Sequence, residues 1–150
     1  MEFDDAEDWA WCDSQFAAIE NYVKNQQLPH GIICDTPEWF TAPYVGLWAV
    51  EDVADPGFVG FWVLAGDSTG VQPQPVPFDH IAAEDLAEPR DAMAAFAKKW
   101  AQQAAAAAKG QAWQGSPVLT GDLPQQAKQL TRQAQLLQLW ASDDELWQLD

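Results

Sequence analysis

Apolar residues recur at helical spacing in three segments of the chain. In the first, positions three and four residues apart run from Trp9 to Val23 and define one face of an amphipathic helix. In the second, Pro89 suits a first helical turn and Gly110 a stop, which predicts a helix over residues 89–109. Residues 123–141 contain the third. The predicted core positions are Cys12, Phe16 and Ile19 in the first helix, Met93, Phe96, Ala97, Trp100 and Ala104 in the second, and Leu123, Ala127, Leu130, Ala134, Leu137 and Ala141, widened by Leu136, Leu139 and Trp140, in the third.

Two β-rich segments, VGLWAV at 45–50 and VGFWVL at 59–64, flank a turn with Pro56 and Gly57. They predict an antiparallel hairpin of about residues 44–51 and 58–65. An even register pairing residue 46 with 62 and 48 with 60 would lay each tryptophan over the glycine of the opposite strand. An odd register would put Trp48 and Trp62 on opposite faces. In the even register the repeated Val-Gly-apolar-Trp sequence is most simply a mutual packing device of the two strands; the sequence leaves both registers open.

Both faces of this hairpin are apolar, so both must be covered. A two-stranded ribbon is marginal in water, and we expect GIIC (31–34) or VPFDHI (76–81) to add a strand. In DTPEWF, Thr36 as N-cap with Pro37 after it predicts a short helical turn. The predicted fold class is α+β: a small antiparallel sheet centred on the tryptophan-rich hairpin and packed with three main α-helices, in a single domain of residues 1–150.

Composition supports a folded protein, because 48% hydrophobic residues and nine tryptophans in 150 residues suffice for a core. Cys12 and Cys34 form neither a CxxC pair nor a multi-cysteine framework, which favours a reducing compartment. The first residues lack the basic and apolar regions of a secretory signal, and no apolar run approaches the roughly 20 residues of a membrane span. We therefore expect a cytoplasmic protein that binds no membrane.

Charge is unevenly distributed along the chain. The net charge is −16, and residues 1–89 hold 17 acidic side chains against a single base, Lys24, whereas residues 90–141 hold six bases. Such a surface repels nucleic acid and anionic membranes. It suits a basic protein partner, or it serves solubility alone.

Few residues form a recognisable catalytic or metal-binding pattern. VLAGDSTG resembles the nucleophile block of the GDSL-type esterases, but the D-x-x-H and G-x-N-D blocks of those enzymes do not occur. A turn with Asp67 and Ser68 bonded to local backbone is the simpler interpretation. On a strand, His30 and Cys34 would be about 13 Å apart, too far to share one ion. We predict no catalytic residue, no metal site and no cofactor.

Carboxylates cluster near the start of the chain, at Glu51-Asp52, at Glu84-Asp85 and at residues 143–145. They offer oxygen ligands or acid–base groups, but no pair is singled out by its spacing. The last cluster has a structural explanation, since Ser142 to Glu145 fits the capping box S-x-x-E. That motif predicts a last short helix carrying Leu146 and Trp147.

The tryptophans divide into core and surface candidates. Trp48, Trp62, Trp100 and Trp140 lie on predicted core stripes. Interfaces are enriched in aromatic anchors. The candidates for a contact surface, off the stripes or in loops, are Trp11, Trp39, Trp113 and Trp147.

Five motifs carry a family resemblance: W-C-D in the first helix, APYVGLWAVE and PGFVGFWVLAGD around the hairpin, PRDAM, and LWASDDELW near the end. The hairpin motifs and the terminal W-A-x-D-D-E-x-W are the specific ones, whereas the helix patterns are generic. In these five motifs the chain resembles a bacterial family, the domain of unknown function 4826, over nearly its whole length. The resemblance implies a bacterial cytoplasmic protein and carries over no catalytic residue.

Two functions remain. The first is a non-enzymatic interaction module, an adaptor or inhibitor-like protein that docks a basic partner or associates with itself; charge reversal within residues 2–8 should then abolish binding. The second is a small-molecule or hydrolase site near residues 36–39, built from Trp39, Tyr44, Asp67 and His80. We favour the first because no catalytic pattern is complete.

Overall fold

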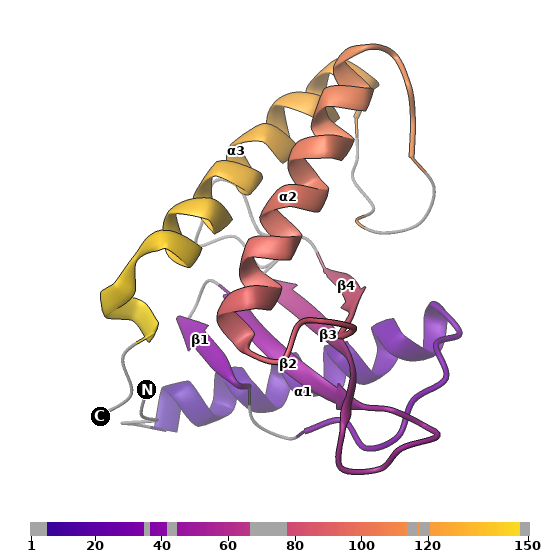
Figure 1. The fold of residues 1–150 in the computed structure, drawn as a ribbon, viewed down its shortest axis with the longest axis vertical. Helices are drawn as coiled ribbons and strands as arrows, with labels where there is room; N and C mark the ends of the chain where they lie inside the picture. The colour runs from indigo at the N-terminus through magenta and orange to yellow at the C-terminus, as the bar shows by residue number, and fades with distance from the viewer. Residues whose placement is uncertain are drawn as a thin grey trace. The chain divides into compact units, whose positions relative to one another are not determined.

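Helices and an antiparallel sheet build the protein, so the predicted α+β fold class is confirmed (Figure 1). The computed structural model describes residues 6–34, 37–41, 45–66, 78–113, 117 and 121–147. The elements, in chain order, are α1 (Ala6–Asn25), β1 (Trp39–Thr41), β2 (Val45–Glu51), β3 (Val59–Gly66), β4 (Asp79–Ala82), α2 (Pro89–Ala108), α3 (Leu123–Ser142) and a 3₁₀ turn, η1 (Asp144–Trp147).

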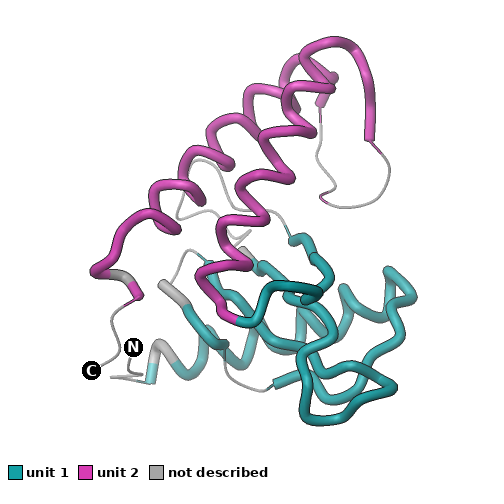
Figure 2. The backbone as a smooth tube through the Cα atoms, viewed as in Figure 1, with its two compact units in different colours: residues 1–87 teal, residues 88–150 magenta. Residues whose placement is uncertain are grey.

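The chain divides into two compact units, residues 1–87 and residues 88–150 (Figure 2). The first unit holds α1 and the sheet, and the second holds α2, α3 and η1. The boundary coincides with the start of α2. Glu88 has extended backbone, φ −114° and ψ 148°, as expected for a residue that precedes a proline.

The sheet is a meander in which each strand pairs antiparallel with the next, in the order β1-β2-β3-β4. Both segments expected to add a strand do pair with the hairpin. Residues 79–82 form β4 beside β3, and Ile33 forms an isolated bridge to Val50 of β2. The helical turn predicted around Pro37 is wrong, because Trp39 and the residue after it extend along β2 as β1. Thr36 and the proline-rich residues 67–77 lie outside the described residues.

Of the two registers that the sequence leaves open, the odd one occurs over most of the hairpin. Glu51 pairs with Val59, but the next pair is Val50 with Phe61, so β3 has one residue more than β2 at a β-bulge. Beyond this bulge the register is odd: Trp48 pairs with Val63, and Ala49 pairs with Trp62. Since side chains alternate along a strand, the two tryptophans lie on opposite faces of the sheet.

The two glycines of the repeat are needed for different reasons. A Cβ at Gly46 would lie 3.0 Å from Trp48 Nε1 and 3.2 Å from Trp11 Cη2, so this glycine makes room for two indole rings. A Cβ at Gly60 would lie 2.8 Å from the Cα of Asp52, so this glycine permits the close backbone approach at the bulge. The repeated Val-Gly-apolar-Trp sequence therefore does not reflect mutual packing of the two strands.

One face of the sheet packs against α1, which crosses the strands (Figure 1). The rings of Phe16 and Trp48 lie 6.2 Å apart across this interface. Its buried cluster consists of Cys12, Ile19, Val23, Trp48, Val50, Phe61, Val63 and Ala65. The helical stripe was predicted correctly from Cys12 onward, but its first member is wrong: Trp9 is 47% exposed, and Trp11 packs against the cluster instead.

In the second unit, α2 and α3 form a helical hairpin whose buried positions match the predicted stripes. At the end of α2 the backbone N–H of Gly110 donates to Ala107 and that of Gln111 to Ala106, the Schellman pattern that a glycine with φ +83° permits. A capping box starts α3, in which Asp122 and Gln125 bond each other's backbone N–H.

Two predictions for the end of α3 are wrong. Leu139 was assigned to the buried stripe, yet it is 68% exposed. Ser142 was assigned as the N-cap of a last helix, yet it is the final residue of α3, and its hydroxyl accepts a bond from Gln138. The residue that precedes η1 is Asp143, whose carboxylate accepts the backbone N–H of Glu145 at 3.0 Å.

Candidate functional site

The end of the β2–β3 hairpin is held in one conformation by its own acidic side chains. Glu51 accepts the backbone N–H of Gly57 at 2.9 Å, and Asp52 accepts that of Ala54 at 2.8 Å. The backbone N–H of Asp52 donates to the carbonyl of Phe58 at 2.9 Å, and Gly57 takes φ +93° at the turn. This connection is thus an ordered loop with two carboxylates built into its hydrogen bonding.

Four large apolar side chains are exposed around this loop, and we call them the hairpin-end patch: Ile32, Val53, Phe58 and Val59, with 67%, 59%, 71% and 37% of their surface exposed. Three of the four are bonded to or paired with Glu51 or Asp52, and Val53 follows Asp52 in the chain. The carbonyl of Ile32 accepts the backbone N–H of Glu51, Val59 pairs with Glu51, and Phe58 bonds Asp52.

The sequence pattern does not predict this patch, because it indicates only a strand at GIIC, only a turn at residues 52–57, and only the start of the second hairpin strand at Phe58 and Val59. The available signal was composition: turns favour Gly, Pro, Asn, Asp and Ser, and Val53 and Phe58 depart from that preference.

Carboxylates predominate near the hairpin-end patch, although Lys24 lines a pocket with His30 and Ile33, next to Ile32. Glu51, Asp52 and Asp55 lie within the loop or next to it, and no Lys or Arg occurs anywhere between Lys24 and Arg90. The surface therefore combines exposed apolar groups with carboxylates.

Trp11 and Trp39, predicted as surface anchors, are largely enclosed. Trp11 is half-buried, with its ring beside Gly46. Trp39 is only 4% exposed and pairs with Leu47, which puts it on the face of the sheet opposite α1. Neither offers a broad exposed ring to a partner.

His80 lies far from Trp39. It pairs with Val63 on the face that packs against α1, and its Nδ1 is 2.7 Å from the Tyr22 hydroxyl. Trp39 is on the opposite face, and β1 and β4 are the two outer strands of the sheet, about 14 Å apart at the usual strand spacing. The structure therefore does not bring these two side chains into one site. Tyr44 and Asp67, assigned to the same site, lie outside the described residues.

Trp113 and Trp147 are half-buried residues of the second unit that bond their own surroundings. The indole N–H of Trp113 donates to the carbonyl of Pro117, and that of Trp147 to the carbonyl of Trp140, at 2.9 and 2.8 Å. One follows the end of α2 and the other follows the end of α3, so the α2–α3 hairpin separates them along its length.

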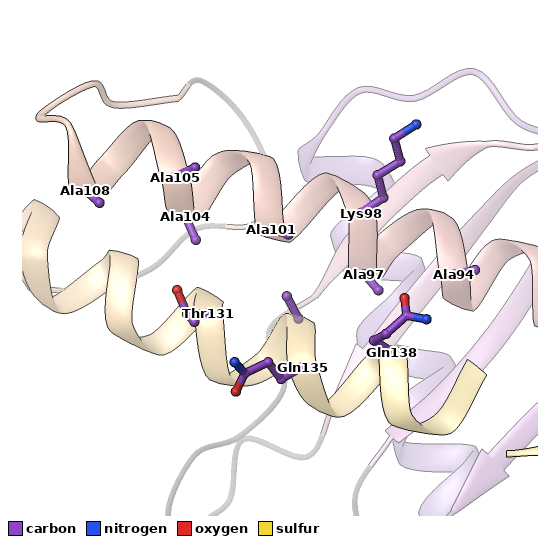
Figure 3. A pocket seen from close by; sticks show the side chains of 11 residues that line it. Ala94, Ala97, Lys98, Ala101, Ala104, Ala105, Ala108, Thr131, Gln135 and Gln138 are labelled. Carbon is purple, nitrogen blue, oxygen red and sulfur yellow. The ribbon is translucent and has the colours of Figure 1, made fainter. Parts of the chain in front are cut away.

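A groove of about 720 Å³ runs between α2 and α3 (Figure 3). Its α2 side is built from alanines, including Ala97, Ala101 and Ala104, which leave space beside α3, together with Lys98. Two of its polar side chains bond within α3: Thr131 to the Ala127 carbonyl and Gln138 to Ser142. The groove is therefore an apolar surface, with little polar chemistry available to orient a ligand.

Within the described ranges, no group of three or more His, Cys, Asp or Glu residues is arranged to hold a metal ion. His30, weighed as a zinc ligand, has its Nδ1 2.7 Å from the neighbouring Gly31 carbonyl. None of the helices that the structure describes has the length and apolar character needed to cross a membrane.

These features define a small α+β protein with an acidic sheet unit, an apolar hairpin end and a separate helical hairpin. The chain belongs to the family described as Domain of unknown function (DUF4826), which matches residues 5–147, so the resemblance seen in its motifs is confirmed. No curated protein and no solved structure is significantly similar to it.

Proposed function

We propose that this protein is a non-enzymatic interaction module whose first unit docks a basic protein partner. The distribution of charge supports the proposal. Residues 1–87 hold sixteen acidic side chains against Lys24 alone, a net charge of −15, whereas residues 88–150 hold seven acidic and six basic side chains, a net charge of −1. The charge asymmetry thus coincides with the boundary between the two units.

A concentrated negative field of this kind accelerates encounter with a positively charged partner and disfavours negatively charged ones. Nucleic acid and anionic membranes are therefore not the partners proposed. The exposed carboxylates of the first unit include Asp13 on α1, Asp55 at the hairpin end and Glu84 after β4, so the field is not confined to one element.

The proposal includes a bacterial cytoplasmic setting. Cys12 and Cys34 are both thiols, in keeping with a reducing compartment. The alternative, a small-molecule or hydrolase site near Trp39, Tyr44 and Asp67, has less support because Trp39 is almost fully buried.

The test is affinity capture of tagged full-length protein from a bacterial lysate at low and high salt, followed by titration of each purified captured protein. We expect a basic partner whose affinity falls as salt rises. One variant reverses the charges of Glu2, Asp4, Asp5, Glu7 and Asp8. A matched variant reverses those of Glu88, Asp91, Asp143, Glu145 and Asp150, so that each variant changes the net charge from −16 to −6.

Loss of binding in the first variant but not in the second supports docking by the first unit. Equal loss in both would attribute binding to net charge alone, and binding that is unchanged in the first variant would overturn the proposal.

A further inference from the structure

We propose that the hairpin-end patch is the surface that contacts the partner directly. The partner segment that binds there is basic and carries exposed apolar side chains of its own. This inference rests on the proposed function and specifies which surface of the first unit makes the close contact.

The first reason is the grouping of exposed apolar side chains. Single apolar residues on a surface are ordinary, whereas several together mark an interaction site. Six large hydrophobic residues are exposed among the described residues, and four of them belong to the hairpin-end patch; the others are Trp9 and Leu139. Phe58 is the most exposed of the six, at 71%, and offers an aromatic anchor.

The second reason is that the surface is already ordered. The backbone N–H of Phe58 donates to the Asp55 carbonyl and its carbonyl accepts from Asp52, while Glu51 and Asp52 hold the N–H groups of Gly57 and Ala54. Ile32 is tied to the same place, since Glu51 donates to its carbonyl at 2.8 Å. A partner would therefore bind without having to order this loop, which favours affinity.

The third reason is charge, which selects the occupant. Glu51, Asp52 and Asp55 lie in or next to the loop of the hairpin-end patch, against one base of the first unit, Lys24, which lines a pocket with His30 and Ile33. A second copy of the chain docking through the same patch would bring these carboxylates against their own equivalents, which is unfavourable. Lysine or arginine side chains beside an apolar anchor satisfy both properties of the surface.

The test uses full-length protein and two peptides of equal length and charge, one of alternating lysine and leucine and one of alternating lysine and serine. We expect tighter binding of the lysine–leucine peptide by isothermal titration calorimetry. Phe58→Ser should weaken that peptide's affinity by about tenfold or more, as truncation of an interface anchor does. It should leave the lysine–serine peptide unaffected.

Controls separate this surface from general exposure and from misfolding. Leu139→Ser removes an equally exposed side chain in the other unit and should change neither affinity. Val53→Ser, a second substitution in the hairpin-end patch, should weaken lysine–leucine binding independently. Circular dichroism of each variant should match that of the wild-type protein, because the hydrogen bonds of the loop use the backbone of Phe58 and not its ring.

Equal affinity for the two peptides, unchanged by Phe58→Ser, would overturn this inference while leaving electrostatic docking in place. Binding of neither peptide, or binding indifferent to salt, would contradict the proposed function itself. A wild-type dimer in analytical ultracentrifugation that Phe58→Ser dissociates would assign the hairpin-end patch to self-association instead.

Discussion

Replacing Trp62 by phenylalanine should destabilise the protein more than the same replacement at Trp48. Both tryptophans are fully buried, and they occupy the same position of the repeated VGxW sequence. The indole N–H of Trp62 donates to the Leu86 carbonyl at 2.9 Å. Among the described residues, the indole N–H of Trp48 is buried without a hydrogen-bond partner. Each substitution removes the same volume from a packed interior, so the cavity cost is similar at the two positions and largely cancels in the comparison.

The remaining difference is the hydrogen bond. Trp62→Phe leaves the Leu86 carbonyl without its indole donor, which costs about 1–3 kcal/mol when the group stays buried. Trp48→Phe instead removes a donor that is already desolvated and unsatisfied. We therefore expect Trp62→Phe to be less stable than Trp48→Phe by about 1–3 kcal/mol, and to melt lower by about 2–4 °C for each kcal/mol in a chain of this size.

Urea unfolding followed by circular dichroism measures this difference without depending on tryptophan emission. Both variants should unfold with the wild-type slope, so that the midpoints report stability alone. Equal losses, or a larger loss for Trp48→Phe, would refute the assignment of the Trp62 hydrogen bond as the distinguishing interaction.

Substitutions at three further contacts are tested by the same unfolding measurement. Gly60→Ala should cost about 1–3 kcal/mol, since its Cβ would lie 2.8 Å from the Cα of Asp52; a variant as stable as the wild type would contradict that close approach. Asp122→Ala should cost about 1 kcal/mol by removing the cap of α3, and Asp122→Asn should restore most of it. Asp144→Asn should cost less than about 1 kcal/mol, because its ion pair with Arg90 is exposed; Arg90→Ala should cost more, since it also removes the bond to the Ala141 carbonyl.

The helices were the most predictable part of the fold. In α2 and α3, apolar spacing depends only on local periodicity, and the buried apolar residues from Met93 to Ala104 and from Ala127 to Ala141 agree with it. Gln133, which is polar and lies off the predicted stripe, is also buried. Leu139 is an exception, because the apolar stripe of α3 is wider than the part of the helix that is buried. The width of the buried part is known only from the packing in the structure.

Predictions that depended on contact between distant segments were less successful. The hairpin register depends on a single extra residue in β3 at the bulge, and the alternating sequence pattern does not indicate where such a residue is inserted. Trp11 replaces Trp9 against the core because Gly46, far along the chain, leaves space for its ring. That partner cannot be inferred from the periodicity of α1.

The candidate site was even less accessible from sequence. Aromatic content directed attention to tryptophans, and the four proposed as a contact surface are buried or half-buried. Four of the six exposed large apolar residues, Ile32, Val53, Phe58 and Val59, lie instead around the hairpin loop, where Glu51 and Asp52 accept backbone N–H groups. Charge alone was readable directly, because a chain's net charge does not depend on its fold.

The meander order of the sheet has a consequence for how the protein acquires its structure. Each strand pairs with its neighbour in the chain, and the central pairing of β2 with β3 closes a loop of only a few residues. Closing short loops costs little entropy, and topologies dominated by local pairings fold faster than those that join distant segments. We expect the β2–β3 hairpin to form early and to serve as the template on which α1 settles, with its exposed loop accessible from the first moments of folding.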